Sequence, residues 1–86
     1  MDVSLETGEA ARASSFDGGL LVLASPRAFA PGAPVRFAAV LEGVDRRFEG
    51  RSLGSRRRND AGFEVRVRLV NLTRGNRIAL TAALAT

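Results

Sequence analysis

The 86-residue sequence contains no cysteine, no histidine, no tryptophan and no tyrosine. Without cysteine or histidine it cannot build a disulfide framework, a Cys or His metal site, or a Cys/His or Ser/His catalytic pair. Without tryptophan and tyrosine it lacks the aromatic side chains that most often anchor protein interfaces. These absences remove most enzyme classes, and we predict a protein that is not an enzyme and uses no cofactor.

Lysine is also absent, so all thirteen basic residues are arginine, against nine acidic residues and a net charge of +4. A modest positive charge permits an anionic partner without requiring one. The longest apolar run, residues 20–24, has the length of a strand, so we predict no membrane span. Residues 1–4 have neither the basic nor the apolar region of a signal peptide, and we expect a cytoplasmic protein.

The dominant pattern is alternation of apolar and polar residues, which is typical of strands with one buried face. It is clearest at residues 35–42 and 63–70. In residues 47–55, Phe48 and Leu53 fall on opposite parities, which predicts a bulge or a barrel bend near Gly50. The expected strands are residues 3–7, 12–15, 20–23, 35–42, 47–55 and 63–70.

Short turn sequences separate these strands, at residues 17–19, 31–34, 42–45 and the hairpin loop 58–62. The tail is rich in helix formers, and Thr73 is a suitable N-cap, so residues 73–84 predict a helix. Alternation from Ile78 to Leu84 leaves a closing strand open as an alternative. We therefore predict one domain, residues 1–86, that is mostly β: a small antiparallel β-barrel of about six strands with a short C-terminal helix. Its expected core is Leu20, Val22, Phe37, Phe63, Val65, Val67, Leu69 and Leu80.

Two groups of residues are candidates for ligand binding. Ser14 and Ser15 precede Gly18 and Gly19, and hydroxyls beside unhindered backbone N–H groups suit a phosphate oxygen. The alternative is a tight strand connection in which glycine supplies a positive φ. The nine carboxylates show no spacing that indicates an acid/base pair.

The densest basic segment is Arg56, Arg57 and Arg58. It can meet a phosphate, a nucleic acid or an acidic protein surface. The alternative is a solvated sheet face, on which arginines pair with carboxylates across strands. The expected pairing joins Arg36, Arg66 and Arg68 to Glu49 and Glu64.

In order and spacing, the sequence resembles the PilZ domain, a bacterial module best known for binding cyclic di-GMP. The resemblance extends from about residue 9 to residue 84. It rests on the Ser-x-x-Gly turn before an apolar strand at residues 15–22, the Pro-Gly-x-x-Val at 31–35, Phe-Glu-Gly-Arg at 48–51, the strand at 62–72, and the tail residues Arg77, Leu80 and Leu84.

The resemblance implies two ligand motifs, and the chain departs from both. The family's Arg-x-x-x-Arg arm is missing, since Arg12 is the sole arginine before Ser15. In the Asp/Asn-x-Ser-x-x-Gly motif, Ser15 and Gly18 are present, but Ala13 replaces the acidic or amide residue. Each lost charge-assisted contact costs roughly 1.5–3 kcal/mol, which predicts nucleotide binding weaker by orders of magnitude.

The sequence therefore predicts a PilZ-type regulatory module in bacterial signalling or motility, with a protein partner and weak or no cyclic di-GMP binding. One alternative is a cyclic di-GMP receptor that uses Arg12, Ser15, Gly18 and Gly19 with part of residues 56–58. Another is a small nucleic-acid-binding barrel based on the arginines at 56–58. Exposed strand edges on a thin core make a homodimer a further expectation.

Overall fold

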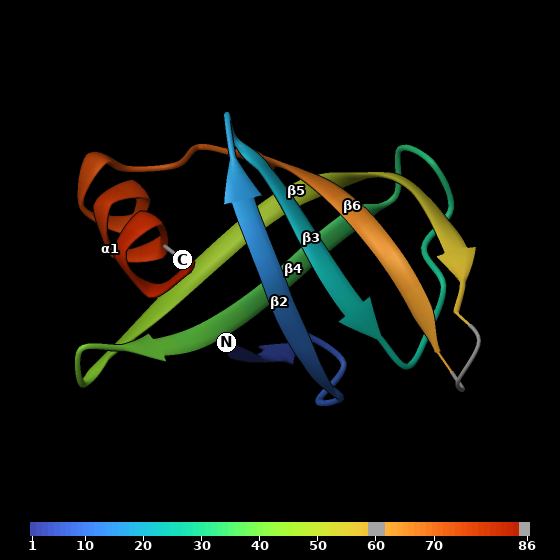
Figure 1. Cartoon of the computed structure of the whole chain (residues 1–86), viewed down its shortest axis with the longest axis horizontal. Helices are drawn as coiled ribbons and strands as arrows, with labels where there is room; N and C mark the ends of the chain where they lie inside the picture. The colour runs from blue at the N-terminus through green and yellow to red at the C-terminus, as the bar shows by residue number, and fades with distance from the viewer. Residues whose placement is uncertain (59–61, 85–86) are drawn as a thin grey trace.

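The computed structural model describes residues 1–58 and 62–84. They form a closed antiparallel barrel of six strands with one short helix at the C-terminal end (Figure 1), as the sequence predicts. The order of the strands around the barrel is β1-β2-β3-β6-β5-β4. The elements are β1 (Asp2–Leu5), β2 (Ala10–Asp17), β3 (Leu20–Ser25), β4 (Pro34–Leu41), β5 (Val44–Arg57), β6 (Phe63–Val70) and α1 (Arg74–Leu84).

The core fills the barrel with the inward-facing residues of every strand. On β4 and β6 the buried positions are every second residue, which confirms the alternation seen in the sequence. Phe37 and Phe48 stack across the β4–β5 pair, with ring centroids 5.1 Å apart. Phe63 is only half-buried, because it is the first residue of β6 and lies at the rim of the barrel. The largest fully buried apolar side chains are Leu21, Leu23, Val35, Val65, Val67 and Leu80.

The predicted core register of β3 is wrong. Leu21 and Leu23 are fully buried, whereas Leu20 and Val22 lie on the outer face and are half-buried. A continuous apolar run carries no alternation, so its own sequence does not indicate which parity faces inward. The two-residue turn before β3 sets the parity by pairing Asp17 with Leu20.

The bulge in β5 lies beyond the predicted position. The register with β6 shifts between Ser52 and Gly54, not near Gly50. Gly50 lies inside the regular ladder, where a Cβ atom would lie 2.5 Å from the Arg68 carbonyl oxygen. This glycine therefore marks a close approach of two strands, which is the other common reason for glycine in a strand. A second shift, between Ala13 and Ser15 in β2, has no counterpart in the prediction.

The tail is a helix, so the closing-strand alternative is wrong. The Thr73 hydroxyl accepts a hydrogen bond from the Asn76 backbone N–H at 3.2 Å, which is the predicted N-cap. Ala79 and Leu80 are buried on the face toward the barrel. The described helix is too short and too polar to cross a membrane.

The helix packs against the side of the barrel where β1 is too short to cover all of β2 and β4. β1 is only four residues long, so β2 and β4 extend past it. There α1 contacts both β2 and β4. Since each described strand has two neighbours in the barrel, the exposed edges expected for a homodimer are largely absent. The homodimer remains a prediction, but exposed strand edges no longer support it.

Candidate binding sites

The turn between β2 and β3 connects the two strands directly. Gly18 and Gly19 have φ values of +59° and +84°, the left-handed values of a type I′ hairpin turn. The Gly19 carbonyl accepts a hydrogen bond from the Leu69 N–H at 3.0 Å. Ser15 is exposed on the bulged part of β2. The turn therefore has the conformation of a tight strand connection with glycines at positive φ, the alternative to a phosphate-binding turn.

Arg12 does not meet the glycine turn. Its guanidinium lies 3.8 Å from the Asp2 carboxylate, and both side chains are well exposed. Arg12 precedes Gly18 by six residues on an extended strand, a separation of about 20 Å. Of the four candidate ligand residues, the structure therefore groups Ser15, Gly18 and Gly19 and leaves Arg12 apart.

Another arginine approaches Ser15 from across the sheet. Ser15 pairs with Val22 on β3, and Val22 pairs with Arg66 on β6, so the serine and Arg66 are two strand spacings apart, about 10 Å. Arg68 is the next outward-facing residue of β6 after Arg66, and it lies directly opposite Arg51 on β5. Sequence reasoning missed this arrangement because it depends on which strands are neighbours in the barrel.

The expected cross-strand ion pairs are partly confirmed. Arg36 lies 3.8 Å from Glu49 and 3.7 Å from Glu6. Glu64, in contrast, pairs with Arg56 at 2.6 Å. The predicted pairing of Arg66 and Arg68 is wrong: within residues 1–58 and 62–84, neither has a carboxylate within 4 Å. Since these two arginines alternate with buried valines, they point outward, while Glu64 is aligned with Arg56 in the register.

The arginines at 56–58 have separate environments. Arg56 is held by Glu64, and the Arg57 guanidinium lies 5.3 Å from the centre of the Phe63 ring. Arg58 lines a shallow hollow of about 410 Å³ together with Arg12. The loop that follows was predicted to extend to Gly62, and its residues 59–61 lie outside the described part of the chain. The three arginines therefore do not converge on a single point.

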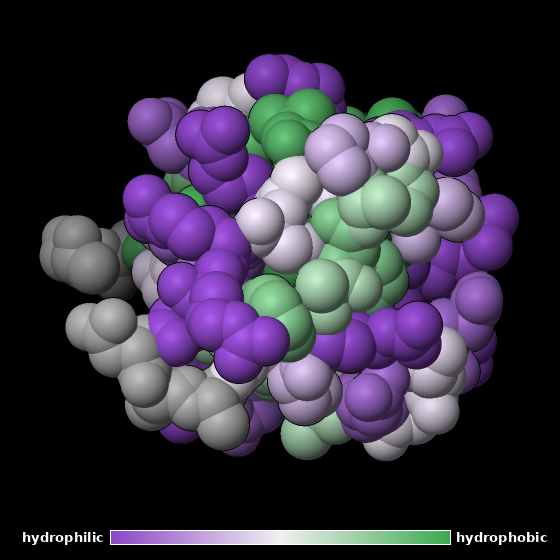
Figure 2. All heavy atoms as spheres, turned by 90° about the vertical axis from the view of Figure 1, so that its right-hand side faces the viewer, coloured by the Kyte–Doolittle hydropathy of each residue, from purple (hydrophilic) through white to green (hydrophobic). Residues whose placement is uncertain are grey.

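A more cohesive surface lies at the end of the barrel where the β3–β4 connection runs. We call it the loop face: the exposed residues Ala28, Ala30, Pro31 and Leu53 around the half-buried Phe29. Figure 2 looks at this end and shows apolar residues gathered at its centre with hydrophilic residues around them. A Cβ atom on Gly54 would lie 3.7 Å from Pro31, so the β5 bulge that carries Leu53 abuts the loop.

Two serines of β5 fix the loop. The Phe29 N–H donates to the Ser55 hydroxyl at 2.7 Å, and that hydroxyl donates back to the Phe29 carbonyl at 2.8 Å. Ser52, which is buried, also donates to the Phe29 carbonyl, and its own backbone bonds to Gly32 and Ala33. These bonds continue the β4–β5 ladder into the connection.

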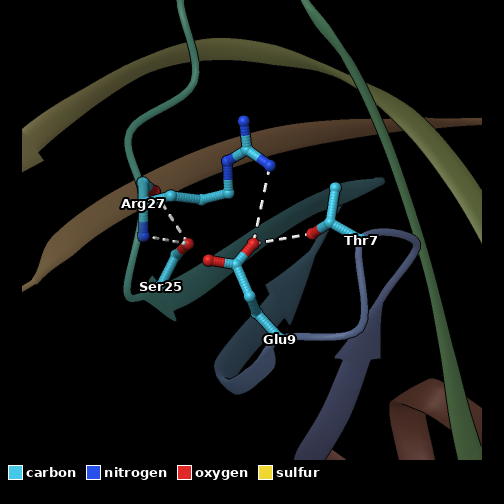
Figure 3. Close-up of polar contacts among 4 residues, drawn as sticks. All are labelled: Thr7, Glu9, Ser25 and Arg27. Carbon is cyan, nitrogen blue, oxygen red and sulfur yellow. Dashed lines mark hydrogen bonds and ion pairs between the residues drawn. The ribbon is translucent and has the colours of Figure 1, made fainter.

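The start of the loop is tied to the β1–β2 turn (Figure 3). The Ser25 hydroxyl accepts from the Arg27 N–H and donates to its carbonyl, which closes a tight turn. The Arg27 guanidinium reaches Glu9 at 3.5 Å, and Glu9 accepts a hydrogen bond from Thr7 at 2.6 Å. Arg27 also lies over the Phe29 ring, 5.4 Å from its centre. The loop is therefore held at both of its ends.

A hollow of about 300 Å³ adjoins the loop face beside Leu53, with Arg56, Arg66 and Glu64 in its wall. A larger depression, about 440 Å³, lies between β4, β5 and the start of α1. Most of its charged groups bind one another: Arg36 contacts Glu6 and Glu49, and Glu49 accepts a hydrogen bond from Asn71 at 2.9 Å. Arg47 also lines it and has no carboxylate within 4 Å among the described residues. The hollow beside Leu53 also holds a guanidinium, that of Arg66, with no carboxylate within 4 Å among the described residues, and it is the one that adjoins the loop face.

Comparison of the chain with protein-family models, with curated proteins and with solved structures finds no match. Within the described residues, no three His, Cys, Asp or Glu side chains cluster closely enough to hold a metal ion.

Proposed function

We propose that this protein is a non-catalytic regulatory module of PilZ type that binds a protein partner and has little or no affinity for cyclic di-GMP. The observation that carries the proposal is the loop face, an apolar surface held in place by buried and half-buried serines and bordered by arginines. A surface fixed before binding loses little conformational entropy when a partner arrives.

The arrangement of the candidate ligand residues supports weak nucleotide binding. Arg12, the one arginine of β2, lies beside Asp2, about 20 Å along the strand from Gly18. Ala13, which occupies the place of the family's acidic or amide residue, is buried in the core. Without these groups a cyclic dinucleotide loses the bidentate guanidinium contacts and the carboxyl or amide contact that the resemblance implies.

A second candidate is a cyclic di-GMP receptor with a non-standard site. It is favoured by the position of Arg66 across Val22 from Ser15, with Arg68 in the next row. Two guanidiniums on one side of the half-buried Leu20 and Val22, and a hydroxyl on the other, form a surface on which a phosphodiester can lie. This candidate no longer needs the arginines at 56–58.

Calorimetric titration with cyclic di-GMP at moderate salt separates the two candidates. The proposed function predicts no measurable heat up to millimolar nucleotide. Micromolar binding that is lost in Arg66→Gln and kept in Arg77→Gln, a change on the exposed face of α1, would establish the second candidate instead. Arg77 is the matched control because it is also an exposed arginine but lies on the helix.

A further inference from the structure

We infer that the loop face binds an acidic peptide segment that carries at least one aliphatic side chain. The inference rests on the proposed function and names the chemistry of the partner. The aliphatic side chain lies on Pro31 and Leu53, and a neighbouring carboxylate enters the hollow beside Leu53 to meet Arg66.

The charge around the loop face selects an acidic partner. Arg51, Arg56 and Arg66 are exposed beside it, and Glu64 offsets only Arg56. Arg66 has no carboxylate within 4 Å among the described residues, and Arg51 donates only to the Gly32 carbonyl, at 3.2 Å. A carboxylate from a partner supplies the missing counter-charge and raises the association rate at low salt.

The apolar centre selects an aliphatic side chain. Leu53 is 41% exposed on a bulge that turns its side chain outward. Pro31 and the loop alanines beside it present short, rigid side chains that need no rearrangement. A leucine or isoleucine of the partner removes this surface from water, which is the main favourable term in such contacts.

The same features weigh against a nucleic acid and a lipid surface. Single-stranded bases need exposed aromatic rings on which to stack, whereas Phe29 and Phe63 are half-buried and covered by Arg27 and Arg57. Insertion into a membrane interface favours protruding tryptophan, phenylalanine or leucine side chains. The loop face is instead bonded down by Ser52 and Ser55, and Leu53 is its single exposed large apolar side chain beside alanine and proline.

Fluorescence anisotropy with synthetic peptides tests the inference on the full chain. The probe is a labelled peptide, Ser-Glu-Glu-Leu-Asp-Glu-Leu-Ser. One control peptide has both leucines replaced by serine, and another has every acid replaced by its amide. We expect the probe to bind with a micromolar to submillimolar Kd. Each control peptide should bind at least about tenfold more weakly, a loss of about 1.4 kcal/mol or more in binding free energy.

Matched variants locate the binding. Leu53→Ser and Arg66→Gln should each weaken the probe about five- to tenfold, the first by removing apolar area and the second by removing a counter-charge. Ile78→Ser and Arg77→Gln make the same chemical changes on the exposed face of α1 and should leave affinity within twofold. Because all four side chains are exposed, far-UV circular dichroism should show that each variant keeps its fold.

Three results would overturn the inference. The first is equal affinity for the probe and for the peptide whose leucines are replaced by serine, which would show that charge alone drives the binding. The second is stronger binding to phosphatidylglycerol vesicles or to oligonucleotides than to the probe. The third is loss of probe binding in Ile78→Ser rather than Leu53→Ser, which would leave protein binding intact as a function but place it on the helix. Failure of the proposed function itself would appear separately, as micromolar cyclic di-GMP binding.

Discussion

Replacing Gly50 with alanine should destabilise the barrel more than its small size suggests. An added Cβ would lie 2.5 Å from the Arg68 carbonyl oxygen and 2.7 Å from the Val67 Cγ1 atom. Ordinary contact is about 3.5 Å or more, so β5 and β6 must separate locally by roughly 1 Å. Overpacking of this kind costs about 1–3 kcal/mol, and weakened ladder hydrogen bonds add about 1 kcal/mol. The reduced entropy of the unfolded chain returns about 0.4–1 kcal/mol.

The net loss of about 1–3.5 kcal/mol, with a centre near 2 kcal/mol, should lower Tm by roughly 10–15 °C in a domain of this size. Far-UV circular dichroism is the suitable assay because the chain has no tryptophan or tyrosine. Gly75→Ala is the matched control: its Cβ would lie 3.8 Å from Arg46, an ordinary contact, in the first turn of α1. It should raise Tm slightly, since alanine favours helix over glycine by up to about 1 kcal/mol. A Gly50→Ala variant that melts like the wild type would refute the close approach of β5 and β6.

Three other substitutions test different parts of the structure by the same melting assay. Val67→Asp places a charge at a fully buried position and should abolish cooperative folding; a normal transition would show that the inward register of β6 is wrong. Thr73→Ala should cost about 1 kcal/mol by removing the N-cap, and Thr73→Ser should restore most of it. Ser52→Ala should cost about 1–3 kcal/mol, because the Gly54 N–H loses its acceptor at 2.9 Å, whereas Ser4→Ala on the exposed face of β1 should change Tm little.

Local pattern was sufficient where one face of an element is buried and the other is polar. The alternation in residues 35–42 and 63–70 gave the inward faces of β4 and β6 correctly. Thr73 gave the start of the helix, because N-capping depends only on nearby residues. The same local logic fails for β3, whose side chains are apolar on both faces.

The candidate binding surfaces were less predictable, because they depend on contacts distant in sequence. The position of Arg66 across Val22 from Ser15 follows from the order of strands in the barrel. The loop face depends on Ser52 and Ser55, whose hydroxyls bond to a residue 23 to 26 positions earlier. The only sequence signal for the loop face was the presence of two serines in an arginine-rich strand, and nothing in the neighbouring residues distinguishes them from serines exposed to solvent.

The most direct test of this account is a nuclear magnetic resonance titration of one isotope-labelled sample with two ligands in turn. The acidic peptide should shift the backbone amides of residues 28–30, 32–33 and 53–56, and cyclic di-GMP at millimolar concentration should leave the amides of residues 15–19 unchanged. Saturable shifts at residues 15–19 and at Arg66 with the nucleotide, and none at the loop face with the peptide, would contradict it.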